Sequence, residues 1–168
     1  KQDPRTASLD KAEGWLADVI NGDVYSQSIV YEARGTRSRR AYAYKGAIYI
    51  NNDSTKTVVH EIGHIIEGKD RQVMSRLTEF LEYRTKSDTT QRLKDLYKNS
   101  GYRANEVTKV DNFLDPYIGK LYKNKDGSYY ATEVLSMGLE MLYEDAYSFA
   151  VNDPEMFDFI VGLIKGLF

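Results

Sequence analysis

The chain contains only two histidines, and they lie four residues apart with a glutamate directly after the first. These are His60, Glu61 and His64, within Thr57-Val-Val-His-Glu-Ile-Gly-His-Ile-Ile66. Residues four apart share one face of a helix, so both imidazoles could reach one metal ion. The pattern H-E-x-x-H is typical of a helix that binds zinc through its histidines and uses its glutamate as a general base. We therefore predict Zn²⁺ as the cofactor, His60 and His64 as ligands, and Glu61 as a catalytic residue.

A catalytic zinc ion also needs a third protein ligand and an open coordination position. With no third histidine and no cysteine in the chain, that ligand must be a carboxylate. The sequence favours Glu133, in the expected first turn of a helix, where the helix dipole stabilises negative charge. The small residues Ser136 and Gly138 would let this helix approach the histidine helix closely. Five other carboxylates stay open as alternatives: Asp70 at the spacing of metzincins, Glu67, Glu79, Glu82 and Glu140.

Length and composition indicate one ordinary globular domain covering residues 1–168. The chain is 42% hydrophobic and 29% charged, and its net charge of −2 gives no reason to expect a nucleic-acid partner. Zero cysteine excludes a disulfide-stapled mini-protein, and no apolar run is long enough to span a membrane. The first residues do not form a signal peptide and include no initiator Met, so we expect a fragment of a longer chain.

The hydrophobic spacing predicts an α+β fold, with a small sheet in the N-terminal half followed mostly by helices. Strands are expected at 29–31 and 41–50, the second with a tight turn at Lys45-Gly46, and a small hairpin is expected to turn at Asp126-Gly127. The arginine-rich stretch 32–40, with Arg34, Arg37, Arg39 and Arg40, could bind an acidic partner, but we interpret it as a solvated loop. Helices are expected over 9–20, 55–67 (stopped by Gly68), 71–83, 90–98, 132–146 and 154–167.

Three segments in this order resemble a known family: HEIGH at 60–64, DPYIGKLY at 115–122 and ATEVLSMGLEMLY at 131–143. Together with 149–162, they resemble the zincin-like metallopeptidase domains of phage and prophage head-morphogenesis (minor head) proteins. More distantly, a Tyr followed by a helix that carries a Glu resembles the lethal-factor-like gluzincins. The ATEVLSMG block is the most specific of these signals.

The resemblance implies a zincin-like metallopeptidase with His60, His64 and Glu133 on zinc and Glu61 as base. It also implies a tyrosine hydroxyl that stabilises the oxyanion. We predict that Tyr122 or Tyr130 supplies that hydroxyl. Tyr117 and Tyr129 are the other candidates. The substrate would be a polypeptide, either a phage structural protein or the parent chain, in the bacterial cytoplasm or the virion.

The substrate backbone is expected to pair with the strand that ends at Ile48-Tyr49-Ile50. Two alternatives to this zinc endopeptidase stay open. One is a non-catalytic structural module of a virion with a stabilising metal site, and the other is a secreted effector or toxin protease. Other divalent ions could also occupy such a site.

Overall fold

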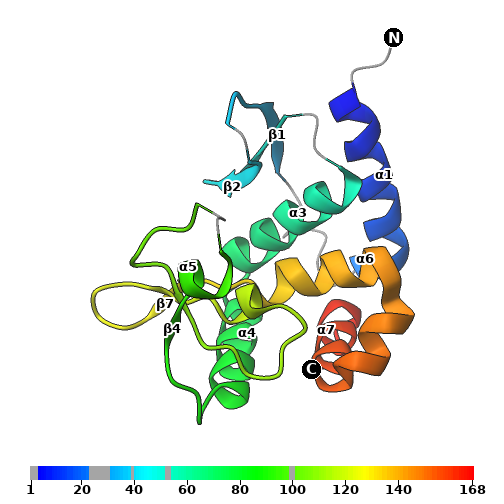
Figure 1. Cartoon of the computed structure of the whole chain (residues 1–168). Coiled ribbons are helices and arrows are strands. Elements are labelled where there is room, and N and C mark those ends of the chain that lie inside the picture. The colour runs from blue at the N-terminus through cyan, green and yellow to red at the C-terminus, as the bar shows by residue number, and fades with distance from the viewer. Residues whose placement is uncertain (1–3, 23–30, 39, 52–53, 99–100) are drawn as a thin grey trace.

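The computed structural model describes residues 4–22, 31–38, 40–51, 54–98 and 101–168, and these form an α+β fold (Figure 1). A short 3-10 helix covers Pro116–Gly119. The helices are α1 (Pro4–Val19), α3 (Thr55–Lys69), α4 (Arg71–Arg84), α5 (Leu93–Leu96), α6 (Val134–Asn152) and α7 (Pro154–Lys165). The α+β class predicted from the sequence is therefore confirmed.

A three-stranded sheet with the order β1-β3-β2 precedes α3. It consists of β1 (Glu32–Gly35), β2 (Tyr42–Tyr44) and β3 (Ala47–Ile50). The central strand β3 pairs parallel with β1 and antiparallel with β2. Lys45 and Gly46 form the predicted turn between β2 and β3, both with positive φ, of 50° and 76°. Thus β2 is an edge strand, whereas both edges of β3 are already paired.

Helices α3 and α6 cross at the centre of the molecule, and the core surrounds them (Figure 1). Val58, Val59 and Ile62 of α3 are fully buried, as is Leu139 of α6. A Cβ on Gly63 would lie 2.7 Å from Ser136 Cα, so the two helices touch backbone to backbone at this glycine. Gly138, which we expected at the same contact, instead faces Ile160 of α7.

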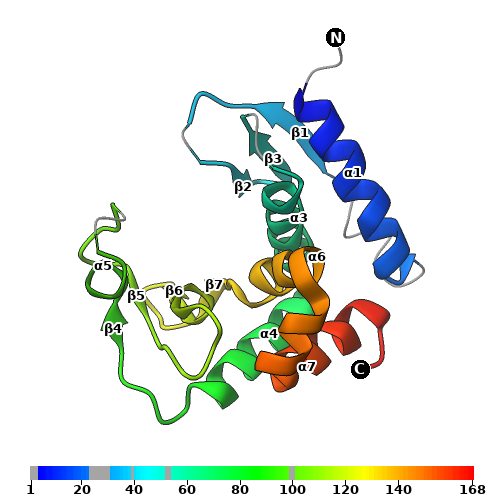
Figure 2. The ribbon, with the colours of Figure 1, turned by 45° about the vertical axis from the view of Figure 1, so that its right-hand side comes forward.

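Two small two-stranded sheets form a lobe on the opposite side of α3 from β1 and α1 (Figure 2). One joins β4 (Gln91–Arg92) to β5 (Val107–Thr108), and the other joins β6 (Tyr122–Lys123) to β7 (Tyr129–Ala131). The second is the hairpin predicted around Asp126-Gly127, and it leads directly into α6.

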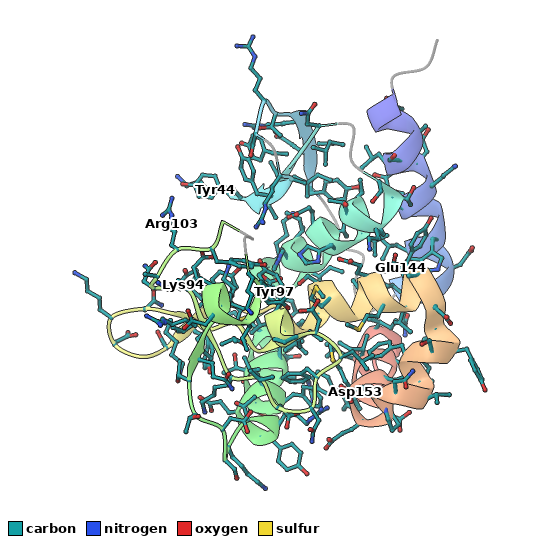
Figure 3. The ribbon with its side chains drawn as sticks, viewed as in Figure 1. Tyr44, Lys94, Tyr97, Arg103, Glu144 and Asp153 are labelled. Carbon is teal, nitrogen blue, oxygen red and sulfur yellow. The ribbon has the colours of Figure 1, made fainter. Side chains whose placement is uncertain are left out.

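Buried ion pairs hold the C-terminal helices together. Asp153, at the junction of α6 and α7 (Figure 3), accepts from Met156 N as the N-cap of α7. Its carboxylate also binds the Arg84 guanidinium of α4, with Nη1 to Oδ1 at 3.0 Å. Arg84 Nε further reaches Asp111 Oδ2 at 2.7 Å. This network fixes the far end of α6, the helix that follows Glu133.

Several predicted boundaries were wrong for local reasons. Of the strand expected at 29–31, residues 29–30 lie outside the described residues and Tyr31 is not part of a strand. Strand β1 begins at Glu32, inside the stretch that we interpreted as a loop. Helix α3 continues through Gly68 to Lys69, because the side chain of Asp70 caps α4 and its N–H closes α3. Helix α5 has only four residues, since residues 91–92 pair with β5 instead.

Candidate metal centre

Helix α3 presents its two histidines toward a cleft while its other side is buried. Ser54 caps the helix by accepting from Thr57 N at 3.3 Å. Isoleucine and valine side chains on both sides of the motif pack into the core. The side chains of His60 and His64 are 14% and 18% exposed to solvent, so a ligand in the cleft can reach them.

The two imidazoles converge on one oxygen of Glu133. Glu133 Oε2 lies 3.4 Å from His60 Nε2 and 3.2 Å from His64 Nε2. The ligand atoms of the three residues all lie within 4.8 Å of one another. Tetrahedral ligands at about 2.0–2.1 Å from zinc are about 3.3 Å apart, so these separations suit one metal ion. The donor set of two imidazole nitrogens and one carboxylate therefore fits a divalent metal, and this group could hold one.

The outer nitrogens of both histidines are already engaged by carboxylates. His60 Nδ1 lies 3.1 Å from Glu140 Oε2, and His64 Nδ1 lies 2.9 Å from Glu67 Oε1. A neutral histidine that donates from Nδ1 keeps the Nε2 lone pair for a metal, and such partners also fix the ring orientation. Both rings therefore offer Nε2 toward Glu133.

Glu133 is 1% exposed, and its own contacts place it. It is the residue immediately before α6, and no hydrogen bond from its side chain caps that helix. Ser136 Oγ donates to Oε2 at 3.0 Å, and Tyr122 Oη donates to Oε1 at 2.5 Å. Burial raises the pKa of Glu133, but the two histidines outweigh it and hold this pKa well below the ordinary value. The carboxylate is therefore ionised, as a metal ligand must be.

Glu61 lies beside the histidines but outside the metal-binding group. It is 6% exposed and lines the same cleft. Burial raises its pKa, while His60, His64 and a hydrogen bond from the Ala43 amide act in the opposite direction. A buried carboxylate with a raised pKa beside a metal site is a stronger proton acceptor than an exposed one.

The cleft in front of these groups has a volume of about 550 Å³. One wall is residues 41–46, which include edge strand β2, and the opposite wall carries Tyr117, Tyr122 and Tyr130. A second cavity, of about 410 Å³, shares His60, Glu61 and Tyr117 with the first. The histidine pair thus lies where two cavities meet, so an extended ligand could pass across it.

The histidines of the metal-free site are expected to be protonated at neutral pH, so zinc must displace protons when it binds. Burial lowers the pKa of His60, but hydrogen bonds to Glu133 and Glu140 outweigh it and raise the pKa to about 9. The same balance raises the pKa of His64 well above its ordinary value. Zinc binding at pH 7 should therefore release protons, and zinc affinity should rise with pH toward 9. Calorimetry in two buffers of different ionisation enthalpy measures this release, and equal heats in both would contradict it.

Glu67 connects the two halves of the site. It is 3% exposed, and besides His64 it accepts hydrogen bonds from Thr132 N at 3.2 Å and Thr132 Oγ1 at 2.8 Å. It therefore positions both His64 and the residue next to Glu133. We expect Glu67→Gln to weaken zinc binding about 10- to 100-fold, as measured by competition with a chelator. The matched control is Glu79→Gln, on the exposed face of α4, which should leave zinc affinity unchanged.

The structure brings together His60, His64 and Glu133, and separates the other carboxylates from the ligand position. Asp70 lies outside the metal-binding group, and its Oδ1 caps α4 by accepting from Gln72 N and Val73 N. Glu140 contacts the outer nitrogen of His60 rather than the metal side. Among the described residues, the metal-binding group includes neither Glu79 nor Glu82.

The tyrosines occupy different positions. Burial and Glu133 raise the pKa of Tyr122, whose proton is engaged by that carboxylate. Tyr117 Oη lies 3.3 Å from Tyr122 Oη and lines both cavities. Tyr130 is 59% exposed on the cleft wall, and Tyr129 stacks against Lys123 instead. A catalytic role for Tyr122 or Tyr130 stays a prediction.

Sequence reasoning missed the roles of Glu140, Thr132 and edge strand β2. The spacing did contain a signal for Glu67, which lies one turn beyond His64 on the same helix face. The pairing of β3 on both sides also corrects the expected substrate strand: Ile48-Tyr49-Ile50 has no free edge, and β2 lines the cleft instead.

Comparison with protein-family models, curated proteins and solved structures gives no match to this chain. The helices of the described residues include none with the length and apolar character that crossing a membrane requires. The site geometry is accordingly the basis for a functional assignment.

Proposed function

We propose that this protein is a zinc-dependent endopeptidase of the gluzincin type, with a zincin-like fold. The observation that carries the proposal is the convergence of His60 Nε2 and His64 Nε2 on Glu133 Oε2, at 3.4 and 3.2 Å. Glu61 lies beside this group in an open cleft. A purely stabilising metal site has no need of such a carboxylate, because Glu61 is not part of the ligand group.

The chemistry divides among the residues of the cleft. A zinc ion held by His60, His64 and Glu133 would supply Lewis acidity toward a carbonyl and a water molecule. Glu61 would accept the proton of the attacking water and then donate it to the leaving amine. Tyr117 and Tyr122 lie close enough to Glu133 to offer a hydroxyl to the oxyanion once the carboxylate is engaged elsewhere.

The substrate would bind as an extended strand along β2. The Ala43 amide hydrogen-bonds to Glu61, so this residue of β2 turns its backbone away from β3 and toward the catalytic base. In an antiparallel ladder the N–H and C=O of one residue point to the same side. The free edge of β2 therefore faces the cleft, and strand addition there would place a peptide bond beside Glu61.

The resemblance to phage head-protein metallopeptidase domains supplies a proposed context, with a virion structural protein or the parent chain as the polypeptide substrate. A non-catalytic module with a stabilising metal site is the alternative that an experiment must separate. The direct contacts of both histidines with Glu133 would hold α3 against α6 in either case.

The test compares zinc-loaded wild type with Glu61→Gln on a mixed library of unstructured peptides, with cleavage read by mass spectrometry. We expect cleavage by the wild type, and a loss of about 100- to 10,000-fold in the variant. Zinc content should stay at about one ion per chain in both proteins. Full zinc occupancy without any cleavage by the wild type would favour the stabilising module.

A further inference from the structure

The walls of the cleft carry a charge pattern that the metal centre does not use. Its acidic residues, Glu61, Glu67 and Glu133, are 6%, 3% and 1% exposed, and each is engaged in the contacts described above. The exposed charged side chains among the described residues that line the cleft are instead two lysines, Lys45 and Lys69. The accessible charge of the cleft is therefore positive, although the whole chain is slightly acidic.

The two lysines gather at one end of the cleft. Lys45 lies in the turn between β2 and β3, and Lys69 lies in the last turn of α3. Lys69 Cε packs 3.6 Å from the position that a Cβ on Gly46 would occupy, so its aliphatic stem lies against that turn. Within the described part of the chain, no carboxylate forms an ion pair with either lysine. Both ammonium groups are thus available to a ligand.

Aromatic side chains line the rest of this end. Tyr42 stacks on Tyr49 with ring centroids 4.5 Å apart, and Lys45 Nζ lies 5.2 Å from the Tyr44 ring. Figure 3 shows Tyr44 at the end of the sheet that faces the lobe carrying Tyr97. A wall of tyrosines and lysines offers hydroxyl and ammonium donors, which suit carboxylate side chains better than cationic ones.

We propose that the cleft selects a polypeptide segment with Asp or Glu side chains, bound at the Lys45–Lys69 end. This inference rests on the proposed function and adds its substrate class. A substrate strand antiparallel to β2 runs from the Lys45 end toward Tyr42. Because Glu61 bonds to Ala43, in the middle of β2, residues that precede the scissile bond lie next to the two lysines.

The test measures binding without catalysis, using zinc-loaded Glu61→Gln and fluorescent peptides that differ only by two Glu, two Gln or two Lys. We expect the Glu peptide to bind about tenfold more tightly than the Gln peptide, as two partly exposed ion pairs would give. The Lys peptide should bind most weakly. Raising the salt to about 0.5 M should reduce the difference, because screening shortens the range of exposed charges.

Matched variants localise the effect. The pair Lys45→Asn and Lys69→Gln should abolish the preference, and Asn tolerates the positive φ of 50° at residue 45. The control Lys11→Gln, on the exposed surface of α1, should keep it. Equal binding of the Glu and Gln peptides, or a preference that survives the double variant, would overturn the inference.

Cleavage by the wild type separates this inference from the proposed function. Acidic residues should lie on the N-terminal side of each cut, and cuts with acidic residues only on the other side would overturn the assigned orientation. Tight binding of the Glu peptide with no cleavage of any peptide would contradict the endopeptidase proposal and support the preference for acidic peptides. Cleavage without a charge preference would support the endopeptidase proposal and contradict the preference for acidic peptides.

Discussion

Glu133→Ala is expected to abolish stoichiometric zinc binding, with affinity at least about 100-fold below that of the wild type. The substitution removes the oxygen on which both histidine Nε2 atoms converge, leaving two ligands where a catalytic zinc site needs three. It also leaves Tyr122 and Ser136 without their acceptor. Zinc content after dialysis measures the effect directly, and the zinc-induced rise in Tm should disappear, because a ligand stabilises only the state that binds it.

Glu140→Ala is the matched control for this experiment. Glu140 contacts His60 from the outer nitrogen, so its removal should weaken zinc binding about 10- to 100-fold but leave about one ion per chain at saturation. Zinc bound equally well in Glu133→Ala, or lost only in Glu140→Ala, would contradict the assignment of Glu133 as the third ligand.

Gly63→Ala should impair both folding and metal binding. A Cβ at this position would lie 2.7 Å from Ser136 Cα and 3.0 Å from Ser136 N, and these are backbone atoms that cannot rotate away. Helices α3 and α6 would have to separate, which moves Glu133 relative to the histidines. We expect the free energy of unfolding of the metal-free protein to fall by about 1–3 kcal/mol, with weaker zinc binding as well.

Gly68→Ala provides the control on the same helix. No atom of the described residues lies within 4 Å of a Cβ at Gly68, so alanine there should leave zinc affinity unchanged and stabilise the helix by about 0.5–1 kcal/mol. Urea denaturation of both variants gives the comparison. If Gly63→Ala were as stable as Gly68→Ala and bound zinc normally, the close contact between the two helices would not be what sets the site geometry.

The local patterns of this sequence predicted most of what lies within one helix or one turn. The spacing of His60 and His64 and the turn at Lys45-Gly46 depend on neighbouring residues, and the structure has both. The sequence pattern favoured Glu133 as the third ligand without excluding the other carboxylates, because helix starts carry carboxylates for many reasons. What distinguishes it is the contact of α6 with α3, which brings residues 73 positions apart along the chain together.

The parts that sequence reasoning missed depend on pairing between distant segments. Nothing in Glu32–Gly35 has the composition of a typical strand, and it forms β1 because β3 offers it a partner. Likewise, β3 is the more apolar strand, yet its central place in the sheet leaves the free edge to β2. The Glu67 contact with Thr132 spans 65 residues, and no local pattern indicates it.

A crystal structure of the zinc-soaked protein, with anomalous diffraction at the zinc edge, tests the central claim most directly. The account predicts one strong peak per chain, within about 2.0–2.2 Å of His60 Nε2, His64 Nε2 and a Glu133 oxygen. Glu61 should lie nearby without contacting the ion, and a coordination position should open toward the cleft. A peak elsewhere, or none at this site under saturating zinc, would contradict the metal centre and the endopeptidase proposed from it.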